Sequence, residues 1–295
     1  MRIGVVGTGN MGLPIARNLV GKGHELSFYA RRPEVVSGLV SLGAASAANP
    51  AAVARASDVT FTCLPGPDEV RQVVLGPGGI AEGALAGMTL IDMTTNSPSL
   101  LRELHATLGE RGVEVLDAPI SGGTYGAASG ELAVMAGGNR ATFDRLQPLL
   151  RDIGDKVVYC GEIGSGMVCK LTNNLINLSF AVVLGEALTS GVRAGVDLHT
   201  LFNAISASSG NSRRMQAHMT RHLFAGDFEA GFALGLATKD VRLALEMARE
   251  TGNPMKLTRQ VYDELLTAIG RGWEDEDCDA VVKLQEEAAG LELRF

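Results

Sequence analysis

The sequence predicts an α/β fold in which a doubly wound, mostly parallel sheet comes first and an all-helical domain follows. Short apolar runs alternate with amphipathic segments up to residue 159, and no convincing strand appears after residue 166. The length of 295 residues suits about two domains. We therefore expect domains at residues 1–163 and 164–295, joined by a long helix.

The order of the elements supports parallel pairing in the first domain. Strand-like runs cover residues 2–6, 25–29, 58–64, 89–93, 113–116, 132–136 and 156–159, and helix-like segments such as 13–20, 99–110 and 141–153 lie between most of them. The strands are apolar almost throughout, as expected when helices cover both faces of a sheet. Later helical patterns cover residues 167–194, 198–208, 235–250, 255–269 and 279–289. The first of these would be about 42 Å long.

The composition excludes several classes of partner. A net charge of −7 without a long basic run argues against nucleic acid. Four cysteines without a C-x-x-C pair argue against a disulfide scaffold and a structural zinc site, so we expect a cytoplasmic protein with no metal. The longest apolar stretch, near residues 175–188, is interrupted by polar residues and is too short to span a bilayer, so we expect no membrane partner.

A glycine-rich turn, GTGNMG at residues 7–12, lies directly between the first strand and the first helix. Such a turn lets the backbone approach a pyrophosphate, which the helix N-terminus then faces. The pattern alone is weak, but its position after a strand and before a helix predicts a dinucleotide site and a Rossmann-type domain. The residues expected to bind the cofactor here are Gly7, Gly9, Asn10, Met11 and Gly12.

The tip of the second strand indicates which dinucleotide binds. An NAD site usually places an acidic residue there to bind the ribose hydroxyls. In this chain Arg31 and Arg32 follow the strand instead, and guanidinium groups suit the 2′-phosphate of NADP. We therefore predict NADP, with NAD as the alternative.

A second motif lies about 160 residues later, where Lys170 and Asn174 are four residues apart near the start of the long helix. Residues at this spacing project from the same face of a helix, and Asn173 lies beside them. A lysine near the start of an apolar helix is less often a solvated surface group, and partial burial suits it to proton transfer. A redox cofactor with such a lysine predicts the interconversion of an alcohol and a carbonyl.

At these residues the chain resembles the β-hydroxyacid dehydrogenase family, typified by 3-hydroxyisobutyrate dehydrogenase. The resemblance covers essentially the whole length. Four segments follow the family's order: residues 7–19, residues 117–130 with DAPISGG at their start, residues 164–174, and Lys239 with Asp240. Agreement at all four is highly specific.

The resemblance implies a role for each matched position. Ser121, Gly122 and Gly123 would bind the substrate carboxylate, Lys170 would be the general acid and base, and Asn174 would orient the substrate hydroxyl, with Asn173 nearby. Leu64, Pro65 and Thr95 would bind the cofactor, and Lys239 with Asp240 would close the site near the cofactor and contact it. The implied reaction moves a hydride between NADP(H) and a small 3-hydroxy carboxylic acid or semialdehyde acid.

Three alternatives share this architecture. An imine reductase typically carries Asp or Tyr where this chain has Lys170. A decarboxylating enzyme of the 6-phosphogluconate type would have Gly-Ile-Glu after Asn174 and a much larger helical domain. A non-catalytic NADP-binding module usually lacks the lysine. The physiological substrate stays open among 3-hydroxyisobutyrate, serine-like acids, glycerate or tartronate semialdehyde, and succinic semialdehyde.

Four further expectations concern the helical domain. Its apolar helices predict a homodimer or homotetramer. His218 and His222 lie four apart without the glutamate of H-E-x-x-H, which favours a surface helix over a metal site. Arg213 or Arg214 could contact an anionic substrate tail, with solvated surface groups an equal alternative. Cys169 is expected in the core.

Overall fold

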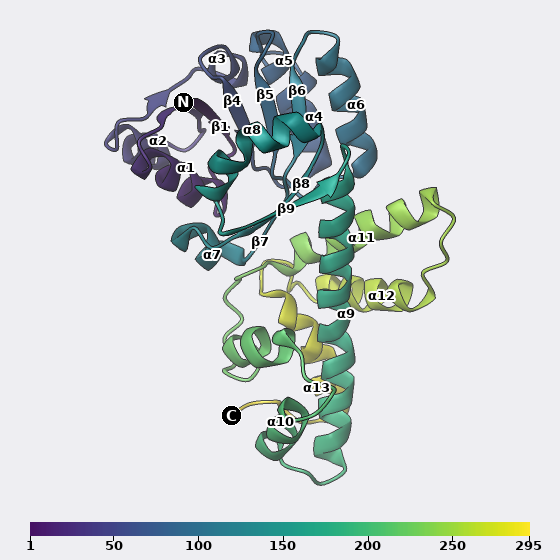
Figure 1. Cartoon of the computed structure of the whole chain (residues 1–295). Coiled ribbons are helices and arrows are strands. Elements are labelled where there is room, and N and C mark those ends of the chain that lie inside the picture. Colours follow the sequence, from purple (N-terminus) through teal and green to yellow (C-terminus); the bar gives the residue numbers. More distant parts are fainter. The chain divides into compact units, whose positions relative to one another are not determined.

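A computed structural model describes residues 1–295 and divides into two compact units, Met1–Lys170 and Leu171–Phe295 (Figure 1). The first unit contains every strand and the second is helical. The division lies within a helix, seven residues after the predicted boundary between residues 163 and 164. Because the first turn of this helix is hydrogen-bonded to the sheet, its opening residues belong to the first unit.

The first unit is built on one sheet of nine strands. Its order is β3-β2-β1-β4-β5-β6-β8-β7, and β9 pairs with β8. The first six strands run parallel, whereas β8 is antiparallel to β6 and β7 and parallel to β9. The strands are β1 (Arg2–Val6), β2 (Glu25–Tyr29), β3 (Ala45–Ser46), β4 (Val59–Thr62), β5 (Thr89–Asp92), β6 (Glu114–Asp117), β7 (Ile120–Ser121), β8 (Ala133–Gly137) and β9 (Lys156–Gly161).

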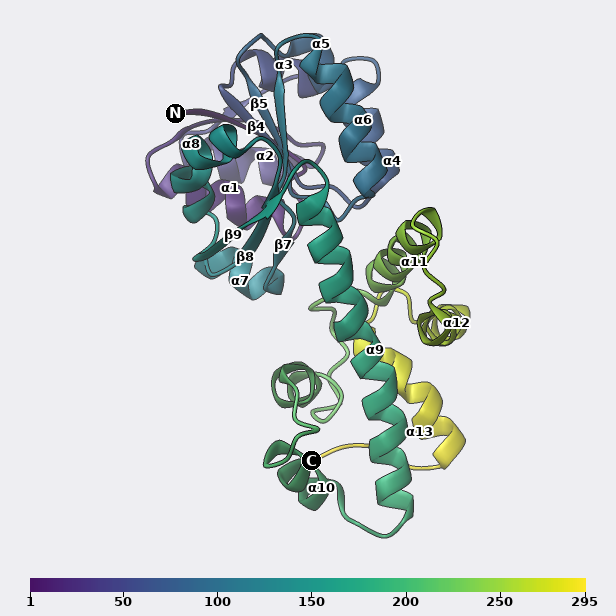
Figure 2. The same ribbon diagram turned by 45° about the vertical axis from the view of Figure 1, so that its right-hand side comes forward.

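Helices cover both faces of this sheet, as Figure 2 shows for α1 and α8 on one side and α4 and α6 on the other. One apolar core joins the sheet to α1 (Gly12–Gly21), α2 (Pro33–Val40), α7 (Gly123–Ser129) and α8 (Arg140–Arg151). A second core joins it to α3 (Pro50–Arg55), α4 (Pro67–Leu75), α5 (Ile80–Gly83) and α6 (Pro98–Gly109). Local sequence explains several helix starts, since proline occupies the first turn of α2, α3, α4 and α6.

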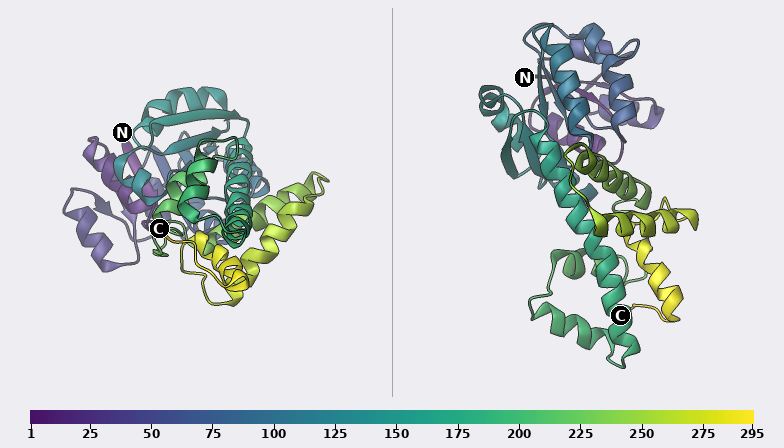
Figure 3. Two further views of the ribbon diagram at one scale, coloured as in Figure 1. Left: turned by 90° about the horizontal axis from the view of Figure 1, so that it is seen from below. Right: turned by 90° about the vertical axis from the view of Figure 1, so that its right-hand side faces the viewer.

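The second unit packs short helices around the later part of α9 (Ser165–Arg193). They are α10 (Leu198–Ser206), the π-helical segment η1 (Arg214–Met219), α11 (Leu234–Glu250), α12 (Lys256–Gly270), the 3₁₀ segment η2 (Cys278–Val282) and α13 (Lys283–Ala289). The helices α11 and α12 lie side by side (Figure 3). The core includes Leu178 and Leu188 of α9, Met215 and Met219 of η1, and Val281 of η2.

The predicted fold class is confirmed. The long strands match within a few residues, but the two-residue strands β3 and β7 were missed because they are too short to show a pattern. The expectation that the apolar stretch is too short to span a bilayer was wrong. By length and composition alone α9 could cross a membrane, although 39% of its most apolar window is buried inside the protein.

Candidate active site

The glycine-rich turn lies at the carboxyl end of β1, between β2 on one side and β4 on the other. This is the switch point of the sheet, where open α/β folds bind ligands. A Cβ at Gly12 would lie 1.8 Å from the carbonyl oxygen of Gly7, so α1 can begin this close to the turn only with glycine. A Cβ at Gly9 would have open space around it, which leaves the backbone accessible to a ligand.

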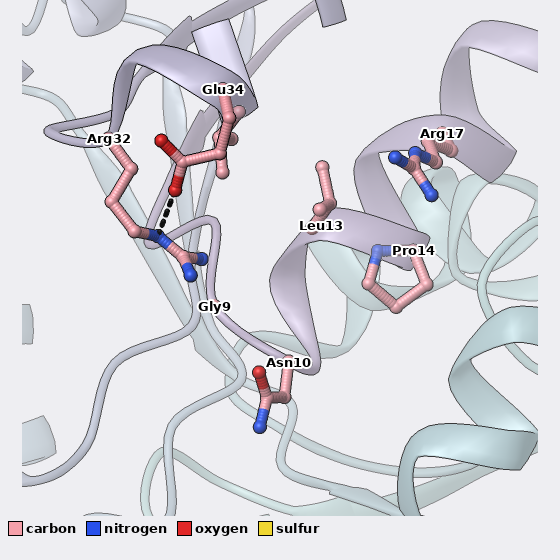
Figure 4. Close-up of a pocket in the computed structure, with 8 residues that line it drawn as sticks. Gly9, Asn10, Leu13, Pro14, Arg17, Arg32 and Glu34 are labelled. Carbon is pink, nitrogen blue, oxygen red and sulfur yellow. Dashed lines mark ion pairs between the residues drawn. The ribbon is translucent and has the colours of Figure 1, made fainter. Parts of the chain in front are cut away.

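A shallow pocket of about 270 Å³ adjoins this turn (Figure 4). Arg32 lies at its edge, where Nη2 donates a hydrogen bond of 3.0 Å to the Thr8 carbonyl oxygen and Nε lies 3.9 Å from Glu34 Oε1. Arg31 is exposed next to it. The pocket therefore presents cations beside the glycine-rich turn, together with one carboxylate, that of Glu34. It is lined by Gly9, Asn10, Leu13, Pro14, Arg17, Arg32, Glu34 and Val35.

The buried carboxylate of Asp92 organises the strand ends next to the turn. It accepts hydrogen bonds from the Thr62 hydroxyl, the Thr94 amide and the Asn96 side chain, at 2.8–3.1 Å. Burial raises the pKa of Asp92, which these donors partly oppose. The Leu64 amide in turn donates to the Thr94 hydroxyl at 3.0 Å. This network joins the segment of Leu64 and Pro65 to the loop of Thr95, both predicted to line the cofactor site.

The predicted carboxylate-binding loop joins β7 to α7. Ser121 ends β7 and is partly buried, whereas Gly122 and Gly123 are exposed. Their φ angles of 141° and 65° are positive, so side chains at these positions would be strained. The loop thus presents a hydroxyl and two unhindered backbone amides, which is the chemistry that a carboxylate requires.

Lys170 is 7% exposed and lies in the second turn of α9. The start of this helix is fixed by Asp117, the last residue of β6. Its two carboxylate oxygens each accept a backbone hydrogen bond of 2.7 Å, Oδ1 from Gly164 and Oδ2 from Met167. A carboxylate at a helix N-terminus satisfies amides that have no partner within the helix. Asp117 therefore sets the position of the turn that carries Lys170, a role that the sequence did not reveal.

The burial of Asp117 leads to a pH-dependent prediction. Desolvation raises its pKa from 3.8 to about 6, although the two backbone donors oppose the rise. Because the pKa is raised in the folded state, protonated Asp117 contributes to the stability of the fold. This contribution is complete below pH 3.8 and is lost as the pH rises through about 6. Linkage converts this rise into roughly 3 kcal/mol. We expect the unfolding free energy of the wild type, measured relative to Asp117→Asn by urea titration, to fall across this interval.

The comparison with Asp117→Asn removes the contributions of other titrating groups, which both proteins share. Above the interval the difference between the two proteins should become constant. A difference that instead grew with rising pH would show that the ionised carboxylate is the stabilising form. The prediction would then be wrong.

Asn174 belongs to a small polar network in the second unit. Its Nδ2 donates a hydrogen bond of 2.6 Å to Asp240 Oδ2, and its Oδ1 accepts one of 3.1 Å from the Asn173 side chain. Lys239 Nζ lies 3.1 Å from Asp240 Oδ1. The structure thus brings together four predicted site residues, and it gives Asp240 a position in which it orients the Asn174 amide.

The expectations for the two histidines and for Cys169 were wrong, and the one for the two arginines fails at Arg214 alone. Arg214 is buried and bonded to Asp279, so it does not face a substrate pocket, whereas Arg213 is exposed. His222 is buried and His218 half-buried, so they do not lie on a surface helix. Cys169 is exposed and not part of the core. A four-residue spacing identifies a common helix face but does not say which side that face turns toward.

Two family profiles match consecutive parts of the chain. Residues 2–161 match the NAD-binding domain of 6-phosphogluconate dehydrogenase. Residues 164–285 match the NAD-binding domain of NADP-dependent 3-hydroxyisobutyrate dehydrogenase. The first covers the sheet and its helices, and the second covers α9 and most of the helical unit.

Curated relatives match over the full length. The chain is 36% identical to 2-(hydroxymethyl)glutarate dehydrogenase of Eubacterium barkeri over 293 residues, 99% of this chain and 97% of that protein. It is 33% identical to 2-hydroxy-3-oxopropionate reductase of Escherichia coli, covering 99% and 100% of the two chains.

Solved structures also match this chain over nearly its full length. The 3-hydroxyisobutyrate dehydrogenase of Mycobacterium tuberculosis, with L-serine, has a TM-score of 0.88 at 30% identity, covering 96% and 98% of the two chains. Psf3 in complex with NADP+ and 2-OPP has a TM-score of 0.84 at 25% identity, covering 96% and 99%.

Proposed function

The chain belongs to the 3-hydroxyisobutyrate dehydrogenase family of NAD(P)-dependent β-hydroxyacid dehydrogenases, and from this premise we propose that it transfers a hydride between NADP(H) and a small 3-hydroxy carboxylic acid or its semialdehyde acid. The observation that carries the proposal is the arrangement on α9. Lys170 is buried one turn before Asn174, and the Asn174 amide is held by Asp240.

The dinucleotide fits the residues present. The turn at residues 7–12 leaves the backbone open at Gly9, and Arg32 is fixed beside it through the Thr8 carbonyl. When bound, the cofactor supplies the hydride chemistry of the nicotinamide ring. The residues proposed to hold it are the glycine-rich turn, the Leu64–Pro65 segment and Thr95, with Arg31 and Arg32 directed to a 2′-phosphate.

The protein's own contribution is to hold the substrate and move one proton. Lys170 Nζ accepts the proton of the substrate hydroxyl during oxidation and returns it to the carbonyl oxygen during reduction. Asp240 takes one N–H of the Asn174 amide, and the second N–H remains for the substrate oxygen. Ser121 and the amides of Gly122 and Gly123 bind the carboxylate, which fixes the distance from the carboxylate to the reacting carbon.

The names of the relatives support a proposal for the substrate class. Both 3-hydroxyisobutyrate and 2-(hydroxymethyl)glutarate carry a hydroxymethyl group on the carbon next to a carboxylate, and 2-hydroxy-3-oxopropionate carries an aldehyde there. We propose that this chain acts on the same pattern, with an oxygen on the carbon β to a carboxylate. The cytoplasmic location stays a prediction.

The test is a panel assay that follows the absorbance of the reduced nicotinamide. The panel contains 3-hydroxyisobutyrate, serine, glycerate, 2-(hydroxymethyl)glutarate and 4-hydroxybutyrate, with a cyclic imine as the reductase substrate. Turnover of a 3-hydroxy carboxylate, with none of the imine, is the expected result. Turnover of the imine alone, or cofactor binding without turnover of any substrate, would refute the proposal.

We also expect the chain to form a homodimer or homotetramer. Ile176, Phe180 and Val183 are 53%, 43% and 54% exposed, and their spacing places them along one side of α9. An exposed apolar stripe of this kind usually marks an interface. Light scattering after size exclusion should give an oligomer at micromolar concentration, and Phe180→Glu should shift it toward monomer.

Leu85→Glu is the matched control, because Leu85 is an exposed leucine in a loop of the first unit. It should leave the mass unchanged. A wild type that is monomeric at the same concentration would contradict the expectation.

A further inference from the structure

A group of charged side chains in the second unit has no part in the proposed reaction. We call it the histidine cluster and define it as Arg214, His218, His222, Asp277 and Asp279. The first three lie four residues apart, at η1 and just beyond it, and the two aspartates belong to the turn that begins η2. Their side chains are buried except for that of His218, which is 28% exposed. A π-helical segment such as η1 is often found at a functional site.

The charges in this cluster do not balance when both imidazoles are neutral. Arg214 pairs with Asp279, and this pairing lowers the pKa of Asp279 against the effect of burial. The Asp277 carboxylate is fully buried and accepts three backbone hydrogen bonds, two of 3.1 Å to Oδ2 from Gly231 and Phe232 and one of 3.0 Å to Oδ1 from Asp279. It has no arginine or lysine within ion-pair distance, and the two histidines lie 3.7 Å away. The amides satisfy the oxygens as hydrogen-bond acceptors but carry no formal charge, so the cluster still holds one more negative than positive charge and could accept one cation.

The hydrogen bonds of His222 fix the direction of its free nitrogen. Nδ1 lies 3.1 Å from the Asp227 carbonyl oxygen, which can only accept, so Nδ1 carries the proton. In the neutral ring Nε2 then has a lone pair, and it lies 3.7 Å from Asp277 Oδ2. This separation is too long for a hydrogen bond. Metal-binding histidines are commonly oriented in this way, with the other ring nitrogen donating to an oxygen.

The separations suit two ligands of one metal ion. Bonds of about 2.0–2.1 Å place two ligands about 3.3 Å apart at the tetrahedral angle, and about 3.7 Å apart when the angle opens to about 130°. A ring nitrogen of His218, a ring nitrogen of His222 and an Asp277 oxygen all lie within 4.8 Å of one another. The three ligand atoms therefore need only a small movement to reach one metal ion, and the half-buried His218 side chain can make it. His218 Nδ1 lies 2.9 Å from Asp279 Oδ2, so this carboxylate orients the ring from the outer shell and leaves Nε2 of His218 as the nitrogen that can bind the ion.

From these observations we propose that His218, His222 and Asp277 bind a divalent transition-metal ion, with zinc as the ion that two imidazoles and a carboxylate suit best. The partial exposure of His218 leaves a water to complete the coordination. The ion would join η1 and the segment that follows it to the turn that begins η2. The site lies wholly within the second unit and includes none of the residues assigned to hydride transfer, so it is independent of the proposed function.

The test is calorimetric titration of ZnCl₂ into the untagged, chelator-treated full-length protein. We expect one ion per chain with a Kd on the order of 10 µM or tighter. His218→Ala and His222→Ala should each weaken binding by about 100-fold or more, because each removes a ligand. His199→Ala is the matched control, since His199 is an exposed histidine of α10 in the same unit, and it should bind zinc as the wild type does.

Cobalt(II) provides an independent readout, since its visible absorption reports a tetrahedral environment that a merely structural role of the histidines would not create. Thermal unfolding with and without ZnCl₂ gives a second one, with the wild type stabilised and the two variants not. If His222→Ala does not fold, His218→Ala decides the question, because its side chain is partly exposed. Zinc binding that is absent at about 1 mM, or equally tight in folded histidine variants, would overturn the proposal. The proposal would also be overturned if the melting temperature rose on acidification but did not change with zinc, because the additional positive charge in the cluster would then be a proton.

Discussion

Replacement of Lys170 by alanine is expected to lower kcat by about 10²–10⁴-fold while leaving NADP(H) binding intact. The variant removes the group proposed to accept and return the substrate proton, but it leaves the glycine-rich turn and Arg32 in place. Single-turnover measurements, with cofactor affinity from fluorescence titration, separate the two effects. Lys156→Ala is the control, because Lys156 is an exposed lysine of the same unit and lies on β9.

Near-normal turnover by a folded Lys170→Ala protein would refute the assignment of Lys170 as the general acid and base. A parallel loss of cofactor affinity would indicate instead that the side chain has a structural role. Lys170→Met keeps most of the apolar stem and removes the amine, so it distinguishes packing from proton transfer. We expect Lys170→Met to be as inactive as Lys170→Ala and more stable.

The polar partners of Asn174 extend this prediction to a positioning residue. Asp240→Asn would replace the carboxylate that accepts the hydrogen bond of Asn174 with an amide. The Asn174 side chain would then no longer be held in one orientation. If Asp240 acts by orienting Asn174, kcat should fall with little change in the affinity for NADP(H). A fall in that affinity without a fall in kcat would instead support the direct contact with the cofactor that the family resemblance implies.

The parts of the fold that the sequence predicted depend on local pattern. The strand β1, the glycine-rich turn and the start of α1 form one continuous stretch, and each restricts the next through backbone geometry. Lys170 and Asn174 likewise share a helix, so their common face follows from spacing alone. The family resemblance added the carboxylate loop, whose roles no spacing rule would have supplied.

The polar contacts that the sequence did not reveal join residues far apart along the chain. Asp117 bonds to amides 47 and 50 residues later, Asn174 to a carboxylate 66 residues later, and Arg214 to one 65 residues later. Each pair is buried, and a buried polar group needs a partner that only the tertiary fold brings near. The wrong expectations for Arg214 and His222 have the same cause. A polar residue in a helical pattern is predicted to be exposed when its distant partner is not known.

The cofactor prediction is the second with a large expected effect. Charge-assisted contacts contribute about 1.5–3 kcal/mol when they are well desolvated, and the exposure of Arg31 and Arg32 reduces this. We still expect NADP to be favoured over NAD by about tenfold or more in kcat/KM, a ratio that corresponds to about 1.4 kcal/mol. Arg31→Ala should erode that ratio by weakening NADP alone. Arg55→Ala, an exposed arginine at the end of α3, is the control.

Glu34 makes this test sharper, because it is the one carboxylate in the pocket beside the turn and lies 3.9 Å from Arg32 (Figure 4). An acid there competes for Arg32 and repels a 2′-phosphate, but it could equally bind the ribose hydroxyls of NAD. If the arginines set the preference, Glu34→Gln should raise the NADP to NAD ratio further, through a lower KM for NADP. If steady-state kinetics instead show NAD preferred, and Glu34→Gln removes that preference, the carboxylate determines the cofactor and the two arginines are solvated surface groups.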